Sequence, residues 1–248
     1  MNSVKGYPSR WRVIVFSTIL AGTVACTSWA QVTNLSGGGS INFSALNNTT
    51  ESVLIGDKLF SNFSFQYVDT DGNMGDDLSA SALVLSALSN QVGFGISVQL
   101  PLVATGPTIK DITLQFSATV TNSDNKISDV HLDFTGSASG NGLAEVSESI
   151  FTNGFGVGNL ANLGLSKNAG GFIPPNGEDT AIFSIPQSKI WVEKDIFVSG
   201  NPDSLPPTPN DFASITIVNQ TFSQIPEPSS IMLALAGMVA FLFVRRRK

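Results

Sequence analysis

The chain has 248 residues and a single cysteine, Cys26, which lies in an apolar segment near the N-terminus. Residues 31–248 therefore contain no thiol group. This absence excludes disulfide bonds, a cysteine nucleophile and a thiolate metal site from that part of the protein.

Positive charge is scarce in the long middle part of the sequence. Residues 31–224 contain six lysines, no arginine and 18 acidic residues, so their formal charge is −12. Nucleic-acid binding requires clusters of basic residues that neutralise phosphate. Bidentate recognition of phosphate or carboxylate depends on arginine. The composition therefore excludes nucleic acid as a partner.

The N-terminus has the three parts of a secretory leader. Basic residues at 5, 10 and 12 precede an apolar run at 13–24, which is short for a bilayer core of roughly 30 Å. Ser28 and Ala30 then supply small residues at the positions that a signal peptidase reads. We expect an N-terminal signal helix within a signal peptide at residues 1–30, with cleavage between Ala30 and Gln31.

A lipoprotein site at Cys26 is the alternative for this end of the chain. Thr23-Val24-Ala25 precedes the cysteine, and Thr23 is a poor match where leucine is usual. Cleavage before Gln31 is the better prediction.

The C-terminus also has three parts in a fixed order. Pro226-Glu227-Pro228 comes first, followed by an apolar run at 231–244 and the basic end Arg245, Arg246, Arg247 and Lys248. As a helix, the run is about 21 Å long, so it is a short transmembrane helix. The basic end should stay cytoplasmic, which leaves residues 31–225 outside the inner membrane. The two prolines favour extended, unpaired backbone that a protease can bind.

This tail resembles the PEP-CTERM sorting signal of Gram-negative bacteria, over about 25 residues. The resemblance implies that residues 225–248 are a sorting and anchor segment read by exosortase, a membrane protease or transpeptidase. The protein would be anchored through 231–244 before processing and then reach the cell surface or the medium. The signal often occurs in species that make exopolysaccharide, which is therefore a possible partner, besides exosortase and signal peptidase.

Alternating apolar and polar residues predict β-strands through residues 31–224. Phe94, Ile96, Val98 and Leu100 alternate with small or polar residues, and similar runs occur at 63–67, 112–120, 130–134 and 213–217. Each strand then has one apolar face, the pattern of antiparallel sheets with one side buried. We expect an all-β domain, an antiparallel β-sandwich of jelly-roll-like or Ig-like topology.

Two stretches depart from this pattern. Residues 79–88 have nearly continuous apolar residues and few β-branched ones, which is compatible with a helix. Residues 153–179 are rich in Gly and Asn and end near Pro174-Pro175, which predicts a long irregular excursion.

An acidic loop at 69–77 is the candidate metal site. It offers oxygen ligands for calcium from Asp69, Asp71, Asn73, Asp76 and Asp77. The spacing fits no complete EF-hand, and an acidic hairpin turn explains the same residues. Calcium is thus a possible ligand, and no other cofactor is indicated.

Candidate catalytic groups have simpler explanations. His131 lies between Asp129 and Asp133 on a polar strand face, and residues 31–224 have no Gly-x-Ser-x-Gly motif. Two acidic pairs, Glu145 with Glu148 and Glu193 with Asp195, are expected by chance among 18 acidic residues. Trp191 is expected to be packed against the strand rather than free to bind a sugar.

The sequence as a whole indicates an exported, non-catalytic surface or matrix protein associated with exopolysaccharide or biofilm. Two alternatives remain open. A carbohydrate-binding module would show an exposed row of aromatic residues on one sheet face. A secreted hydrolase would show a cleft with converging acidic residues.

Overall fold

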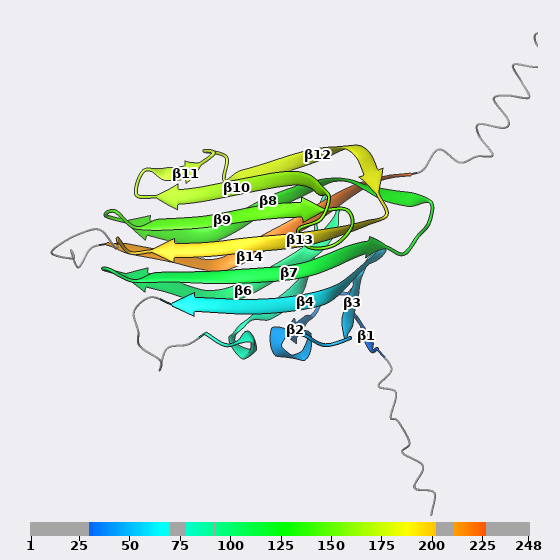
Figure 1. The fold of residues 1–248 in the computed structure, drawn as a ribbon, viewed down its shortest axis with the longest axis horizontal. Helices are drawn as coiled ribbons and strands as arrows, with labels where there is room; N and C mark the ends of the chain where they lie inside the picture. Colours follow the sequence, from blue (N-terminus) through cyan, green and yellow to red (C-terminus); the bar gives the residue numbers. More distant parts are fainter. Residues whose placement is uncertain (1–29, 70–77, 92, 202–210, 227–248) are drawn as a thin grey trace, which may run out of the picture.

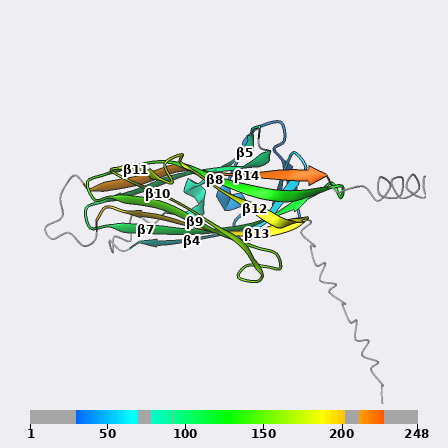
Figure 2. The same ribbon diagram turned by 90° about the horizontal axis from the view of Figure 1, so that it is seen from above.

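The computed structural model of the protein describes residues 30–69, 78–91, 93–201 and 211–226. They form two β-sheets stacked face to face (Figures 1 and 2). Sheet A contains, in spatial order, β1 (Val32–Asn34), β3 (Ser52–Ile55), β4 (Lys58–Asp69), β7 (Ile109–Val120), β13 (Lys189–Ser199), β9 (Leu143–Phe151), β10 (Asn159–Asn168) and β11 (Gly171–Ile173). Sheet B contains β12 (Glu178–Gln187), β8 (Asn125–Ser139), β14 (Phe212–Pro226), β6 (Phe94–Thr105), β5 (Val84–Ser89) and β2 (Ser40–Asn42). Two short 3-10 helices, η1 (Phe43–Ala45) and η2 (Ala80–Ala82), lie on the connections.

Eight of the strands have the connectivity of a jelly roll. The chain passes from β6 to β7, β8 and β9 by crossing to the other sheet at each step, and it crosses again from β12 to β13 to β14. The resulting orders, β6-β14-β8-β12 in one sheet and β7-β13-β9-β10 in the other, are those of two Greek keys folded together. The sandwich is therefore jelly-roll-like rather than Ig-like. Every pairing is antiparallel except that of β1 with β3 at the edge of sheet A.

Alternation along each strand places the core between the sheets, as the sequence predicts. In β6, Ile96, Val98 and Leu100 are buried, whereas Gln99 is exposed. Gly95 in the same strand has a separate role, because a Cβ atom there would lie 1.8 Å from the carbonyl oxygen of Gln220. Glycine thus lets β6 approach β14 closely.

Three charged or polar side chains interrupt this apolar core. Lys194 on β13, Glu148 on β9 and Gln220 on β14 are 1%, 2% and 1% exposed. All three occupy inward positions at which the neighbouring alternate residues are apolar. They contact one another across the two sheets.

The expected helix at 79–88 is wrong. Only Ala80–Ala82 is helical, as one 3-10 turn, and Val84–Ser89 is strand β5 between β2 and β6. Leu83 and Leu85 point into the core at strand spacing. Pairing with β6 along the whole of β5 overrides the weak helical preference of this segment.

The expected irregular excursion at 153–179 is also wrong. It contains β10, which pairs with β9, and the short β11. Leu163 and Leu165 are buried, which is the inward face of a strand. The glycines and asparagines that suggested a loop mark the turns on either side of these strands.

The start of β1 and the end of β14 lie at the same end of the sandwich (Figure 1). β14 runs two residues past Gln224, the expected domain boundary, and its last residue, Pro226, is paired with Asn125. Pro226 is extended, as expected, but it belongs to the sheet. Within the described residues, no helix is long and apolar enough to cross a membrane. The expected signal helix and the segment at 231–244 lie outside those residues.

Candidate functional site

The outer surface of sheet A carries a row of hydrogen-bonding side chains that we call the sheet A face. It is formed by outward-pointing residues of three neighbouring strands: Asp111, Thr113 and Gln115 on β7, Glu193 and Asp195 on β13, and Ser147 and Ser149 on β9. Six of these residues, all except Gln115, line a pocket of about 300 Å³. The pairing of the strands fixes their spacing, because Glu193 lies opposite Gln115 and Ser149, and Asp195 lies opposite Thr113 and Ser147.

Two carboxyl groups on this face, those of Asp111 and Asp195, lie close enough to interact. Partial burial, the hydrogen bond with Asp195 and the negative charge of Asp195 together raise the pKa of Asp111 to about 7. The Oδ1 atom of Asp111 is buried and has no hydrogen-bond partner among the described residues. Asp111 therefore keeps its proton to a higher pH than an ordinary aspartate, and a protonated carboxyl group can donate a hydrogen bond.

The rest of the sheet A face is organised by side-chain hydrogen bonds. Gln115 Nε2 donates to Glu193 Oε2 over 2.6 Å, and Ser64 Oγ on β4 donates to Gln115 Oε1 over 3.1 Å. On the other side, Ser149 Oγ donates to Asn162 Oδ1 on β10 over 3.1 Å. Such a network holds the acceptor and donor positions in place before any ligand binds.

An aromatic side chain lies at one end of this face. Trp191 precedes Glu193 by two residues on β13, so it points outward, and it is partly exposed. Its ring packs edge-to-face on Phe155, with centroids 5.0 Å apart, and Lys189 Nζ lies 4.1 Å from its centroid. Trp191 is packed, as expected, but against outer-surface neighbours. Trp191 is the next outward residue along β13 from Glu193, but it does not line the polar pocket.

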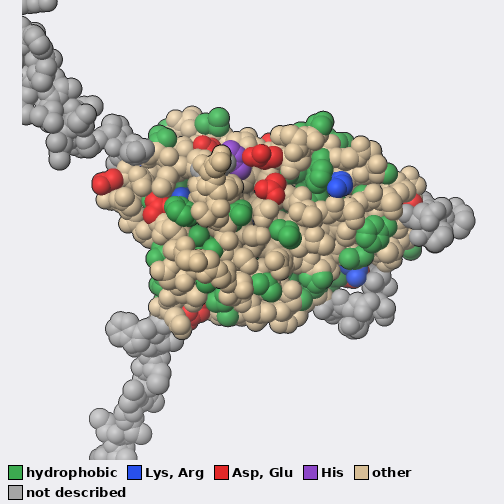
Figure 3. Space-filling view, turned by 180° about the vertical axis from the view of Figure 1, so that it is seen from behind, with side chains coloured by type: hydrophobic (Ala, Val, Ile, Leu, Met, Phe, Trp, Pro, Cys, Tyr) green, Lys and Arg blue, Asp and Glu red, His purple; other side chains and the backbone are tan. Residues whose placement is uncertain are grey.

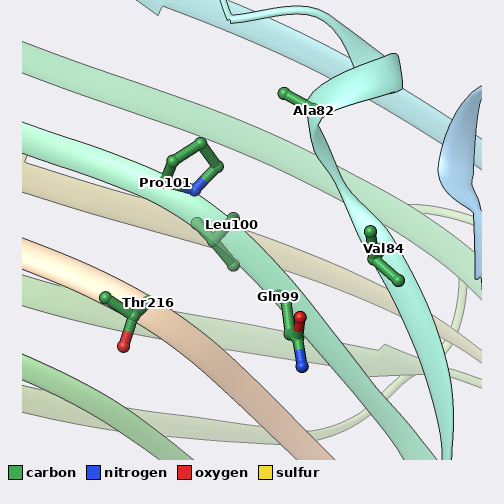
Figure 4. A pocket seen from close by; sticks show the side chains of 6 residues that line it. All are labelled: Ala82, Val84, Gln99, Leu100, Pro101 and Thr216. Carbon is green, nitrogen blue, oxygen red and sulfur yellow. The ribbon is translucent and has the colours of Figure 1, made fainter.

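One hollow on the outer surface of sheet B is less polar than the sheet A face. A shallow hollow of about 320 Å³ is lined by Ala82, Val84, Gln99, Leu100, Pro101 and Thr216 (Figure 4). Gln99 and Thr216 provide its polar side chains. The sheet A face is the better candidate for a ligand that requires several hydrogen bonds.

His131 lies on the outer surface of sheet B, where the histidine side chain is next to acidic groups (Figure 3). Its Nδ1 atom is 2.9 Å from Glu178 Oε1 and from Thr180 Oγ1, and its Nε2 atom is 3.0 Å from Asp129 Oδ1. Ser223 Oγ is farther from Nε2, at 3.4 Å. Both ring nitrogens thus lie within hydrogen-bonding distance of carboxylate oxygens, and Asp129 Oδ1 is closer to Nε2 than Ser223 Oγ is, which is not the geometry of a serine nucleophile on its histidine base. The expectation of a structural, polar strand face agrees with this geometry.

Of the two acidic pairs identified in the sequence, only one has both side chains on the same face of its strand. Glu145 and Glu148 are separated by an odd number of positions on β9, so Glu145 points outward and Glu148 points into the core. Glu193 and Asp195 do share the sheet A face. Nothing in the sequence pointed to Asp111, because it lies on another strand. Only the pairing of β7 with β13 brings it to Asp195.

Four of the five candidate calcium ligands lie outside the described residues: Asp71, Asn73, Asp76 and Asp77. The remaining residue, Asp69, accepts a hydrogen bond from Tyr67 Oη over 2.7 Å and lies 3.4 Å from Lys110 Nζ. Within the described part of the chain, no group of three or more His, Cys, Asp or Glu side chains could hold a metal. Calcium binding by the loop stays a prediction.

Of the expected processing sites, the described chain includes Ala30, Gln31 and Pro226. Ala30 and Gln31 are exposed. Glu227, Pro228 and Arg245, Arg246 and Arg247 lie outside the described residues. Just before Pro226, Lys58 Nζ donates to Gln224 Oε1 and to Asp57 Oδ1, both over 3.2 Å. This buried lysine fixes the end of β14 against the turn between β3 and β4.

Residues 224–248 match the family described as the PEP-CTERM protein-sorting motif. The C-terminal tail is thus this sorting signal, as its sequence suggested. The motif indicates export, membrane-anchored sorting and processing by exosortase. No curated relative matches the sequence.

Solved structures with similar folds are distant. The Glycosylation Associate Protein (Gap123) complex from Streptococcus agalactiae is 11% identical, with a TM-score of 0.30, over 59% of this chain and 25% of that chain. TmCBM61 in complex with beta-1,4-galactotriose is 6% identical, with a TM-score of 0.29, over 64% and 88%. The family 11 carbohydrate-binding module from Clostridium thermocellum is 9% identical, with a TM-score of 0.25, over 66% and 88%. TM-scores this low establish nothing about ligands or activity.

The Asp111–Asp195 pair makes a prediction about stability. Because the pKa of Asp111 is raised from 3.8 to about 7 in the folded state, the folded protein holds a proton that the unfolded chain releases. Stability should therefore fall as the pH rises from about 4 to 7. Asp111→Asn should remove this slope and stabilise the protein at pH 8 by ~1 kcal/mol, a value reduced for partial exposure.

Urea unfolding at several pH values measures the effect. Asp124→Asn removes an equal charge from an exposed turn and serves as the matched control. Parallel pH dependence of wild type and Asp111→Asn would contradict the raised pKa of Asp111.

Proposed function

We propose that this chain, which carries a PEP-CTERM sorting motif at residues 224–248, is a non-catalytic surface protein whose jelly roll binds polysaccharide on the sheet A face. Its leader is cut between Ala30 and Gln31. The segment at 231–244 anchors it until exosortase acts. Residues 31–226 then remain at the cell surface or in the matrix around the cell.

One observation carries the binding proposal: a row of fixed hydrogen-bonding side chains borders a partly exposed aromatic ring. Sugar hydroxyls donate to carboxylates and accept from amides and hydroxyls, and the sheet A face offers all of these. Trp191 offers an apolar surface next to them. A broad, open face of this kind fits an extended chain rather than a small molecule.

Charge restricts the class of polysaccharide. Asp111, Glu193 and Asp195 lie together on the sheet A face. An acidic polysaccharide would be repelled, because like charges in the same site disfavour binding. The proposed ligand is therefore a neutral polysaccharide or one that carries amino groups, and exopolysaccharide of that kind is the expected partner.

Co-sedimentation with insoluble polysaccharides tests the binding. The full-length chain in detergent would be mixed with particles of cellulose, galactan and chitin. We expect binding to at least one of them. Trp191→Ala and Asp195→Asn should each weaken it about tenfold, equivalent to roughly 1.4 kcal/mol.

Gln99→Ala on the outer surface of sheet B is the matched control and should bind like wild type. Absence of binding to every particle, or an equal loss in the Gln99 variant, would refute the proposed site.

The second candidate function is glycoside hydrolysis, because several acidic side chains converge on the sheet A face. A glycosidase holds its two carboxyl groups roughly 5–10 Å apart, so Asp111 and Asp195, which are hydrogen-bonded to each other, would have to separate around the substrate. The same incubations distinguish the two functions. Release of reducing ends, lost in both Asp111→Asn and Asp195→Asn, would make the protein a hydrolase.

A substitution in the tail tests the sorting half of the proposal. Replacing Pro226, Glu227 and Pro228 with alanine should leave export and fold intact and block maturation. Full-length protein should then accumulate in the inner membrane, and the amount at the surface should fall several-fold.

Changing Arg245, Arg246 and Arg247 to serine should give a different defect, a wrongly oriented or displaced anchor, because these residues hold the tail in the cytoplasm. Membrane fractionation and immunoblotting measure both variants. If the triple-alanine protein is cut and localised like wild type, the tripeptide is not the recognition element.

A further inference from the structure

The buried side chains Lys194, Glu148 and Gln220 form a closed polar cluster in the centre of the sandwich. Lys194 Nζ donates hydrogen bonds to Glu148 Oε2 and to Gln220 Oε1. Lys194 and Glu148 are directly paired across β13 and β9, whereas Gln220 reaches them from β14 in the other sheet. An amine, a carboxyl group and a carboxamide thus meet at one point.

The surroundings of the cluster are apolar on both sides. Within sheet A, Lys194 is paired with Leu114 and Glu148 with Leu163; within sheet B, Gln220 is paired with Ile96 and Leu132. These four aliphatic residues are between 0% and 5% exposed. Two polar atoms of the cluster, Glu148 Oε1 and Gln220 Nε2, are buried without a hydrogen-bond partner in the described part of the chain. A buried ion pair with unsatisfied atoms contributes little stability, so this arrangement calls for another explanation.

Burial also sets the reactivity of the groups. It lowers the pKa of Lys194, although the Glu148 carboxylate works in the opposite direction. Burial raises the pKa of Glu148, again opposed by Lys194. Both shifts favour the uncharged pair, in which a free amine lies beside a carboxylic acid. A free amine is a nucleophile, and desolvation activates lysine in this way.

We propose that Lys194 and Gln220 form an intramolecular isopeptide bond that joins β13 of sheet A to β14 of sheet B. Nζ attacks the carboxamide carbon Cδ of Gln220, the new Nζ–Cδ bond forms, and the Cδ–Nε2 bond breaks. The protonated carboxyl group of Glu148 gives its proton to Nε2, which leaves as ammonia, and takes one proton from Nζ in exchange. Four N–H bonds and one carbonyl group are conserved in this balance, no electron is transferred, and no other reactant is required.

The product removes one of the two buried polar atoms that lack a partner in the unreacted cluster. Nε2, which has no partner, departs as ammonia. The single N–H that stays on Nζ can donate to Glu148. Gln220 is the acceptor rather than Glu148 because Glu148 is needed to carry the proton, as a general acid and base in contact with the reacting nitrogen. The inference does not depend on polysaccharide binding.

Peptide mass spectrometry of the full-length wild-type chain tests the bond. After unfolding, a protease that cuts before aspartate separates the peptide starting at Asp179, which ends at Lys194, from the one starting at Asp211, which contains Gln220. We expect a single branched peptide, lighter than the sum of the two by the mass of one ammonia molecule. Fragmentation should place the branch at Lys194 and Gln220.

Variants identify the role of each group. Glu148→Gln and Lys194→Arg should each give two separate peptides, whereas Lys189→Arg, the matched control at a partly exposed lysine, should keep the branch. Circular dichroism checks that each variant is folded. The peptide mass spectrum of the wild-type chain tests the bond even if some variants do not fold.

Two separate wild-type peptides of full mass would overturn the proposal. A branch between Lys194 and Glu148, lighter by one water molecule, would also overturn it.

Discussion

The sandwich cannot close until its last strand is in place. β14 lies between β6 and β8 in the middle of sheet B and is paired with both along nearly its whole length. It also supplies Val218 and Phe222 to the core and Gln220 to the buried cluster. The C-terminal residues of the domain therefore complete a core whose other strands come earlier in the chain, so contacts distant in sequence dominate the fold.

This constraint connects the fold to the sorting signal. The strand that closes the sheet is the strand that runs into Pro226, and Lys58 holds its end at Gln224. A cut downstream of Pro226 removes no part of the core. On the proposed route, folding would be completed beside the membrane, while the tail still holds the chain, and release would yield a finished domain. A covalent link from β13 to β14 would attach that last strand permanently to the opposite sheet.

The sequence predicted the class of fold because each long strand shows the period of two that burial on one side imposes. It could not distinguish the jelly roll from an Ig-like sandwich, because the order of strands depends on pairings between distant segments. β10 was missed because its turns dominate the composition, although Leu163 and Leu165 carry the strand pattern. β5 was missed because helix preference was weighed without its neighbour β6.

Only part of the sheet A face could be predicted from the sequence. Glu193 and Asp195 share a face, as their spacing implies, but Asp111 joins them through pairing of β7 with β13, which the sequence does not reveal. The buried cluster of Lys194, Glu148 and Gln220 could be recognised in part from the sequence. Lys194 stands between Val192 and Ile196, and Glu148 stands in the same way between aliphatic residues of β9. A charged residue at an inward position of a strand marks either a paired core group or a reactive one.

The proposed function depends most on one claim, that the chain is an exported domain that is trimmed at both ends. The intact mass of the protein recovered from cells tests it most directly. The account predicts a chain that begins at Gln31 and has lost the apolar segment at 231–244, with the whole jelly roll retained. A mass that corresponds to the uncut chain from Met1 to Lys248 would contradict it.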